Sequence, residues 1–142
     1  MRNRRNGGIT LIELMIVVVI IGILGALAVP RFMRATTRSK QLEAKNILKR
    51  IYVMETAYHQ EKDTYYPPSG EVTFQPGQTI KELGIEIPLH SRYEYRISGG
   101  TNSFTATAET INPNGLDDDA TIDLWYINET GNLTCATDDA SQ

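Results

Sequence analysis

The fold is decided by residues 8–30, which read GITLIELMIVVVIIGILGALAVP. Between positions 9 and 29 the only polar side chains are Thr10 and Glu13. As a helix this segment is roughly 30 Å long, at about 1.5 Å per residue, which is enough to cross a bilayer. Three arginines precede it, at positions 2, 4 and 5, so the positive-inside tendency places the N-terminus in the cytoplasm and the rest of the chain outside.

Two other interpretations of this segment stay open. An ordinary secretory signal also has a basic start and an apolar middle, and Ala26-Leu27-Ala28 offers the small-residue pattern that a signal peptidase cuts after. An uncleaved single-pass anchor is the third interpretation. Glu13 and Pro30 argue against the secretory signal, because a carboxylate in an apolar span costs about 2.5–3.5 kcal/mol on insertion scales and usually has a partner.

The segment from Gly8 to Leu14, followed by the apolar run and Pro30, resembles the leader and N-terminal helix of type IV prepilins. The resemblance implies that a prepilin peptidase cuts between Gly8 and Ile9 on the cytoplasmic side, removes residues 1–8 and methylates the new amino terminus. Ile9 departs from the family pattern, in which phenylalanine or methionine is more usual at this position.

Glu13 acquires a role from the same resemblance. When subunits stack through their apolar helices, its carboxylate is expected to pair with the amino terminus of a neighbour, because a lone buried charge is costly and both groups are stable there only as a pair. This pairing would favour the correct register during assembly. The alternative is a pair within one chain, with the amine of Ile9 one helical turn away.

The helix is predicted to be least stable in its next part, which contains Gly22, Gly25 and Pro30. Pro30 removes a backbone hydrogen bond and crowds the carbonyl of Ala26. Similar pilins lose helix locally here when they are packed in filaments, which implies the same for residues 22–30. A simple kink, with small residues that ease helix contact, is the alternative.

Beyond Pro30 the apolar positions thin to helical spacing, which predicts that the helix continues to about Gln60 and buries one face. The residues on that face are Ala44, Ile47, Leu48, Ile51, Met54 and Tyr58. We expect an α+β fold in which a long N-terminal helix packs by its second half against a small antiparallel sheet, like the handle of a ladle. The expected parts are a leader (1–8), a transmembrane or filament-core helix (9–30) and a globular head (31–142).

The sheet is predicted from the alternation of apolar and polar residues. Tyr93, Tyr95 and Ile97 share one face of a strand, a turn follows at 98–102, and the return strand carries Phe104, Ala106 and Ala108. A third strand is expected at 121–128, with a turn at 129–132 that leads to a fourth at 133–136. Residues 67–91 hold many prolines and glycines, which predicts an irregular connection with one helical turn at 80–83.

Residues 117–123 hold four carboxylates just before a strand, and such crowding is repulsive unless a cation neutralises it. Calcium takes six to eight oxygen ligands, so we consider a calcium site with Asp117, Asp119 and Asp123 as ligands, together with loop carbonyls near Leu116. The loop resembles the calcium loop of major pseudopilins of type II secretion, although its spacing does not match an EF-hand. The alternative is a solvated acidic turn.

Charge is sorted along the chain. Residues 31–50 hold seven basic side chains against Glu43 alone, whereas the chain from Ile51 onward holds four basic and fifteen acidic ones, a formal charge of −11. The acidic head argues against nucleic-acid binding. The basic stretch is expected to face lipid headgroups, acidic surfaces of neighbouring subunits, or water.

Other motifs add little. Cys135 is the only cysteine, so no intrachain disulfide can form, and we expect a partly buried thiol. Asn128-Glu129-Thr130 and Asn132-Leu133-Thr134 match the N-glycosylation pattern, which arises often by chance. We find no nucleophile motif, phosphate loop or Cys-His cluster, so we do not expect an enzyme.

The resemblance therefore implies a structural subunit of a type IV pilus filament. It implies three partners: prepilin peptidase, an assembly platform in the inner membrane, and copies of this chain or related pilins. The subunit would lie in the bacterial inner membrane before assembly and in an extracellular pilus afterwards. The alternative is a pseudopilin of a type II secretion system, with a calcium-binding loop and a periplasmic filament.

Overall fold

The computed structural model describes residues 8–113, 115–116 and 121–141. The chain divides into two compact units, Met1–Ala35 and Thr36–Gln142, and helix α1 (Leu11–Lys62) contributes to both. The helix ends close to the predicted position. Asp63 follows it with a φ of 55°, a left-handed conformation that aspartate tolerates better than most residues and that stops the helix.

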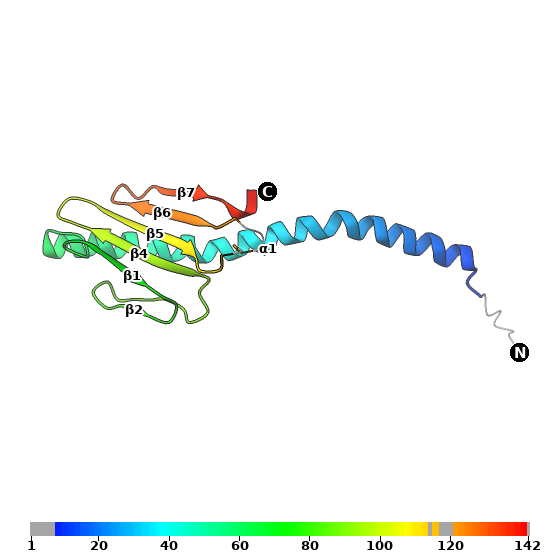
Figure 1. Ribbon diagram of the computed structural model, residues 1–142, viewed down its shortest axis with the longest axis horizontal. Coiled ribbons are helices and arrows are strands. Elements are labelled where there is room, and N and C mark those ends of the chain that lie inside the picture. Colours follow the sequence, from blue (N-terminus) through cyan, green and yellow to red (C-terminus); the bar gives the residue numbers. More distant parts are fainter. Residues whose placement is uncertain (1–7, 114, 117–120, 142) are drawn as a thin grey trace, which may run out of the picture. The chain divides into compact units, whose positions relative to one another are not determined.

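The second unit contains a five-stranded antiparallel sheet in the order β1-β4-β5-β6-β7 (Figure 1). Its strands are β1 (Glu71–Phe74), β4 (Tyr93–Gly99), β5 (Phe104–Thr110), β6 (Leu124–Asn128) and β7 (Leu133–Thr137). The predicted hairpin is β4–β5, and the two later strands are β6 and β7. A short 3₁₀ helix (Asp139–Ser141) follows the sheet.

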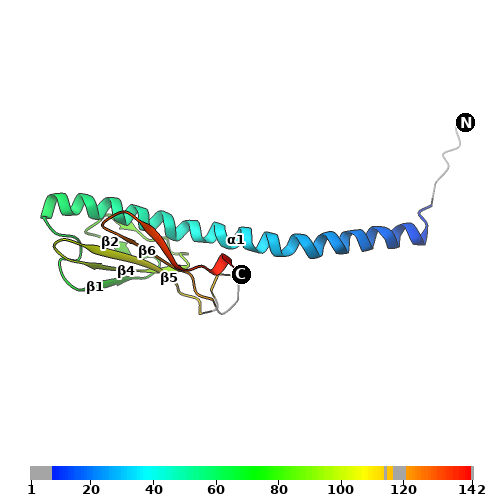
Figure 2. The same cartoon turned by 90° about the horizontal axis from the view of Figure 1, so that it is seen from above.

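The part of α1 that belongs to this unit lies along one face of the sheet (Figure 2). Small side chains line the centre of that face: Ala106 and Ala108 in β5 lie between larger neighbours on β4 and β6. The residues paired with them are Ile97, Tyr95, Ile127 and Trp125, and all six are buried in one core with the helix. The α+β prediction is thereby confirmed.

The connection between α1 and β4 is more regular than predicted. The segment Glu71–Phe74 adds β1 to the edge of the sheet, and β2 (Thr79–Ile80) and β3 (Ile85–Glu86) form a separate hairpin. The prediction of an irregular connection was therefore wrong for these segments. Strands of two to four residues between glycines and prolines carry too little alternation to stand out in the sequence. The predicted turn near residues 80–83 is present, but it joins β2 to β3.

The buried face of α1 also differs from the prediction: it includes Thr37 and Gln41, and it differs again after Ile51. Met54 is 38% exposed, and Glu55 is fully buried in its place. Ile51 and Glu55 are four residues apart and so lie on the same side of the helix. A search for apolar periodicity selects methionine over glutamate, which is why the sequence alone misassigned this position.

Glu55 fixes the end of the helix to the segment that follows it. The backbone N–H of Tyr66 donates to its Oε2 at 2.8 Å, whereas the buried Oε1 has no hydrogen-bond partner in the described part of the chain. Burial raises the pKa of Glu55 from 4.5 to about 7, against the opposing effect of the Tyr66 hydrogen bond. The folded chain therefore holds a proton on Glu55 more readily than the unfolded chain does.

This linkage predicts the pH dependence of stability. The contribution of Glu55 to the free energy of unfolding is fully present below about pH 4.5. It is lost as the pH rises through about 7, because the carboxyl group then ionises in a buried site. The neutral variant Glu55→Gln should gain about 1–2 kcal/mol relative to the unmodified chain between pH 5 and pH 8, after allowance for solvent screening. Urea unfolding of the full chain in detergent, at several pH values, measures this difference. The exposed Glu71→Gln serves as control, and parallel curves for Glu55→Gln and the unmodified chain would contradict the assignment.

Candidate assembly site

Gly8 and Ile9 lie just before Thr10 and α1, and both are exposed. Ile9 is 76% exposed, and a Cβ atom added at Gly8 would meet nothing within 4 Å. Neither residue is covered by the rest of the described chain. The residues that come before Gly8 in the predicted leader lie outside the described part of the chain.

Thr10 and Glu13 form the N-terminal cap of α1. The backbone N–H of Glu13 donates to Oγ1 of Thr10 at 3.3 Å, and the N–H of Leu14 donates to the Thr10 carbonyl at 3.2 Å. This threonine cap was not predicted, although the pattern Thr-x-x-Glu before an apolar run is its usual signal. The Glu13 carboxylate itself is exposed and has no hydrogen-bond or ion-pair partner among the described residues, so it is available to a second chain.

The first half of α1 presents an apolar surface that nothing in this unit covers. Its large apolar side chains from Leu11 to Val29 are each 47–77% exposed. By length and composition the helix could cross a membrane. A shallow groove of about 360 Å³ runs along it, lined by Ile12, Met15, Ile16, Val19 and Ile20. Such a surface requires either lipid or other apolar helices around it.

Gly22 and Pro30 lie within the continuous helix. A Cβ atom added at Gly22 would meet nothing within 4 Å, so the glycine leaves a flat place on the helix surface. Pro30 does not interrupt α1 in the single chain. The predicted loss of helix concerns the packed filament and stays a prediction.

The third predicted ligand of the calcium site, Asp123, lies inside the head. Its carboxylate is fully buried and accepts four hydrogen bonds. Oδ1 accepts from Nε2 of Gln41 at 2.9 Å and from the backbone N–H of Asp139 at 3.3 Å, whereas Oδ2 accepts from the Tyr93 hydroxyl at 2.5 Å and from Nε1 of Trp125 at 2.6 Å. Burial, together with the hydrogen bond to Asp123, raises the pKa of Tyr93.

This role of Asp123 could have been found in the sequence. Residues 123, 125 and 127 alternate with outward-facing ones, so Asp123 falls on the same inward face as Trp125 and Ile127. A carboxylate has about four lone-pair sites, and here each is taken by a donor from the protein. Asp123 thus holds the helix to the sheet in this structure, and it has no free lone pair for a metal ion.

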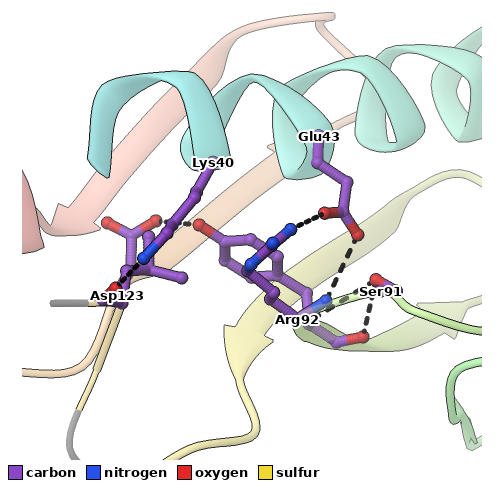
Figure 3. A network of polar contacts seen from close by, with 7 residues as sticks. Lys40, Glu43, Ser91, Arg92 and Asp123 are labelled. Carbon is purple, nitrogen blue, oxygen red and sulfur yellow. Dashed lines mark hydrogen bonds and ion pairs between the residues drawn. The ribbon is translucent and has the colours of Figure 1, made fainter. Parts of the chain in front are cut away.

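Lys40 and Arg92 make polar contacts between α1 and two neighbouring loops (Figure 3). Nζ of Lys40 donates to the carbonyl of Leu116, which was expected to contribute to a calcium site. The Arg92 guanidinium contacts Oε2 of Glu43 at 3.3 Å and so ties the loop before β4 to the helix. Asp117 and Asp119 lie outside the described residues. Within the described ranges, no group of three or more His, Cys, Asp or Glu side chains could hold a metal ion.

Cys135 in β7 is a half-buried free thiol, as expected. Burial raises its pKa, which lowers the reactive thiolate fraction.

The family model described as the prokaryotic N-terminal methylation motif matches residues 3–29. This range includes Gly8, Ile9, Glu13 and Gly22, and it ends one residue before Pro30. No solved structure matches the chain.

Three curated proteins show similarity over longer ranges. The chain is 48% identical over 96 residues to the type IV major pilin protein PilA of Myxococcus xanthus (strain DK1622), which covers 68% of this chain and 39% of that protein. It is 30% identical over 141 residues to the type II secretion system core protein G of Pseudomonas aeruginosa, which covers 88% of this chain and 99% of that protein. It is 27% identical over 131 residues to a fimbrial protein of Neisseria meningitidis serogroup A, with 92% of this chain and 72% of that protein covered.

The chain spans only about two fifths of the length of the Myxococcus protein. The alignment with the secretion protein, in contrast, extends over nearly all of both chains. Together with the N-terminal methylation motif and the helix-on-sheet fold, these similarities place the sequence in one group of proteins: the chain belongs to the type IV pilin and pseudopilin family.

Proposed function

We propose that this chain is a structural subunit of a type IV pilus filament, assembled through its apolar N-terminal helix. The observation that carries the proposal is the exposed apolar surface of α1 with one unpartnered carboxylate, Glu13, near its start. The 48% identity to a type IV major pilin supports it. The function is mechanical and requires no catalytic group.

Processing comes first in the proposed sequence of events. Prepilin peptidase cuts between Gly8 and Ile9 and methylates the new amino terminus. The exposure of both residues and the match to the N-terminal methylation motif support this step. Before assembly the processed chain stays in the inner membrane, held by the apolar part of α1.

Assembly then transfers the helix from lipid to the filament core. An assembly platform in the inner membrane inserts each subunit, and copies of this chain or related pilins surround it there. Glu13 pairs with the amino terminus of a neighbouring copy, because both charges are stable in an apolar core only as a pair. Gly22 and Pro30 give the packed helix a segment that can lose its hydrogen bonds under load. The filament then lies outside the cell.

The type II secretion pseudopilin is the second candidate function. The alignment that covers 99% of a type II secretion core protein favours it. In this case the filament stays periplasmic, and a calcium ion bound by Asp117 and Asp119 would stabilise the loop before β6. Asp123 does not fit as a ligand, because its lone pairs are occupied.

The processing step predicts the mass of the N-terminal peptide. Chain recovered from membranes or from sheared surface material should begin at methylated Ile9. Gly8→Val should block cleavage and leave the chain at Met1, because a branched side chain would occupy the site at which the peptidase cuts. Peptide mass spectrometry distinguishes these ends. A chain that begins at Val29 would show an ordinary secretory signal, and an unmodified chain that begins at Met1 would show a fixed anchor.

The assembly step predicts that substitutions at Glu13 and at Thr10 change the filament yield differently. Glu13→Gln should leave processing intact and lower the yield of sheared filaments by at least about 100-fold, since losing a buried ion-pair partner costs about 3–5 kcal/mol. Thr10→Ala removes the cap but keeps the carboxylate, so filaments should still form. The cap itself is unchanged in Glu13→Gln, because the backbone N–H of Glu13 makes that hydrogen bond. A normal filament yield from Glu13→Gln would contradict the ion pair.

The two candidate functions differ in their response to calcium. A calcium-dependent loop predicts that millimolar calcium raises the melting temperature of the full chain in detergent, by several degrees, and that Asp117→Asn with Asp119→Asn removes the increase. The control is Glu86→Gln, which neutralises an exposed carboxylate outside the loop. An unchanged melting temperature in calcium and in chelator would remove this support for the pseudopilin function.

A further inference from the structure

The face of α1 that points away from the sheet carries a row of cations and apolar side chains. We define the basic ridge as Arg38, Leu42, Lys49, Arg50 and Val53, all of which are exposed. Their spacing places them on one side of the helix, opposite the buried Leu48 and Ile51. The two carboxylates on this stretch of α1 lie elsewhere: Glu43 is half-buried and paired with Arg92, and Glu55 is fully buried.

The cations of the basic ridge are unpaired in the described part of the chain. In contrast, Lys40 donates to the Leu116 carbonyl, Lys45 lies 4.0 Å from the ring centre of Trp125, and Arg96 contacts Glu94 and Glu109. The ridge cations are thus available to a partner outside this chain.

A groove of about 280 Å³ adjoins the basic ridge. It is lined by Lys49, Arg50, Val53, Met54, Gly84 and Ile85. Val53 is 59% exposed and Met54 38% exposed, so the lining combines exposed apolar side chains with two cations. This combination fits a protein surface that carries carboxylates next to apolar groups.

The same chain offers such carboxylates at the end of the head where α1 stops. We define the acidic end as Asp63, Glu71 and Glu129, which are exposed and have no ion-pair partner among the described residues. Asp63 directly follows the helix, and the neighbouring Tyr65 bonds Gly100 in the β4–β5 turn. Glu71 pairs in register with Ser98 just before that turn.

Glu129 lies at this end as well. It sits in the β6–β7 turn directly after Asn128, whose register partner is Thr105 at the start of β5. The acidic end thus brings together one residue after α1, one at the start of β1 and one in the β6–β7 turn.

We propose that the basic ridge of one copy binds the acidic end of a second, parallel copy that is displaced along the helix axis. The inference rests on the proposed filament function, which supplies the parallel arrangement. From Lys49 to the end of α1 at Lys62 the distance along the axis is roughly 20 Å, at about 1.5 Å per residue, which sets the displacement between the two copies. The contact joins two different surfaces, so it propagates along a filament and does not close into a dimer.

Charge reversal on each surface tests the pairing. The ridge-reversed chain carries Lys49→Glu and Arg50→Glu, and the end-reversed chain carries Glu71→Lys and Glu129→Lys. Each alone should give at least about 10-fold fewer sheared filaments than the unmodified chain, because like charges then meet at every contact. Expressed together, the two should restore filaments that contain both chains in equal amounts, since each reversed surface then meets a complementary one.

Controls separate this inference from the function on which it rests. Ala136→Glu, which adds an exposed charge on β7 outside the basic ridge and the acidic end, should assemble normally. If the unmodified chain forms no filaments, the proposed function fails. If it assembles and both reversed chains assemble equally well, or if their mixture restores nothing, the ridge-to-end contact is overturned. If the ridge-reversed chain assembles normally but no longer binds anionic membranes, the ridge binds lipid headgroups instead.

The melting temperature of each variant in detergent checks that it folds. Should a reversed chain unfold, the neutral pair Lys49→Gln and Arg50→Gln gives a second test. Its filament yield should fall and lose its dependence on salt, because screening acts only on the charged contact. A yield equal to that of the unmodified chain at low salt would overturn the proposal.

Discussion

The large apolar side chains from Leu11 to Val29 keep 47–77% of their surface exposed in a single chain, and their removal from water is the constraint on which the rest of the structure depends. Each such side chain contributes about 1.5–3 kcal/mol when it is buried, so the segment cannot remain in water. A bilayer removes it from water, and so does a bundle of like helices. Lipid tails are as apolar as leucine, however, so the hydrophobic effect hardly distinguishes the two environments. Transfer from one to the other must be decided by packing and by polar contacts, which is the reason for the role that we propose for Glu13.

The head is subject to a different constraint. Here the second half of α1 must remain packed against a sheet that is exposed to water. Two buried carboxylates contribute at separate points. Asp123 accepts a hydrogen bond from Gln41, and Glu55 accepts one from the backbone of Tyr66, which follows the helix. Gln41 and Glu55 are roughly 21 Å apart along the helix, at about 1.5 Å per residue. Between them lies the apolar core, where Ala44 and the alanines of β5 are fully buried. The contact at Gln41 limits sliding between helix and sheet, which apolar contacts alone specify poorly, and the contact at Glu55 fixes the segment that leaves the helix.

The sequence predicted those parts of the fold that repeat a pattern. The apolar run, the helical spacing after Pro30 and the alternation in residues 93–108 are long enough to identify α1, β4 and β5 without a structure. Strand β1 was missed because four residues show too little alternation, and its place depends on pairing with β4. Glu55 was missed for a related reason: a buried carboxylate is stable only through partners that the sequence does not reveal, here the backbone N–H of Tyr66. The burial of Asp123 follows from its spacing with Trp125 and Ile127, but its hydrogen-bond partners Gln41 and Tyr93 are distant in the sequence. Among the candidate assembly residues, Gly8, Ile9 and Glu13 are exposed as their predicted roles require, whereas Asp117 and Asp119 lie outside the described residues.

Filament assembly needs specificity that the apolar helices cannot supply. Apolar contact is not directional, and a helix with exposed isoleucine, valine and leucine on all sides accepts many registers and rotations. One ion pair at Glu13 would fix the axial position of a neighbour near the start of the helix, but a single contact leaves rotation about the axis free. A second polar contact at the head would remove that freedom. The unpaired cations on the outer face of α1 and the unpaired carboxylates beyond its end would provide such a contact between two copies. Because electrostatic attraction acts over a longer distance than apolar contact, it would orient an arriving subunit before the apolar surfaces meet.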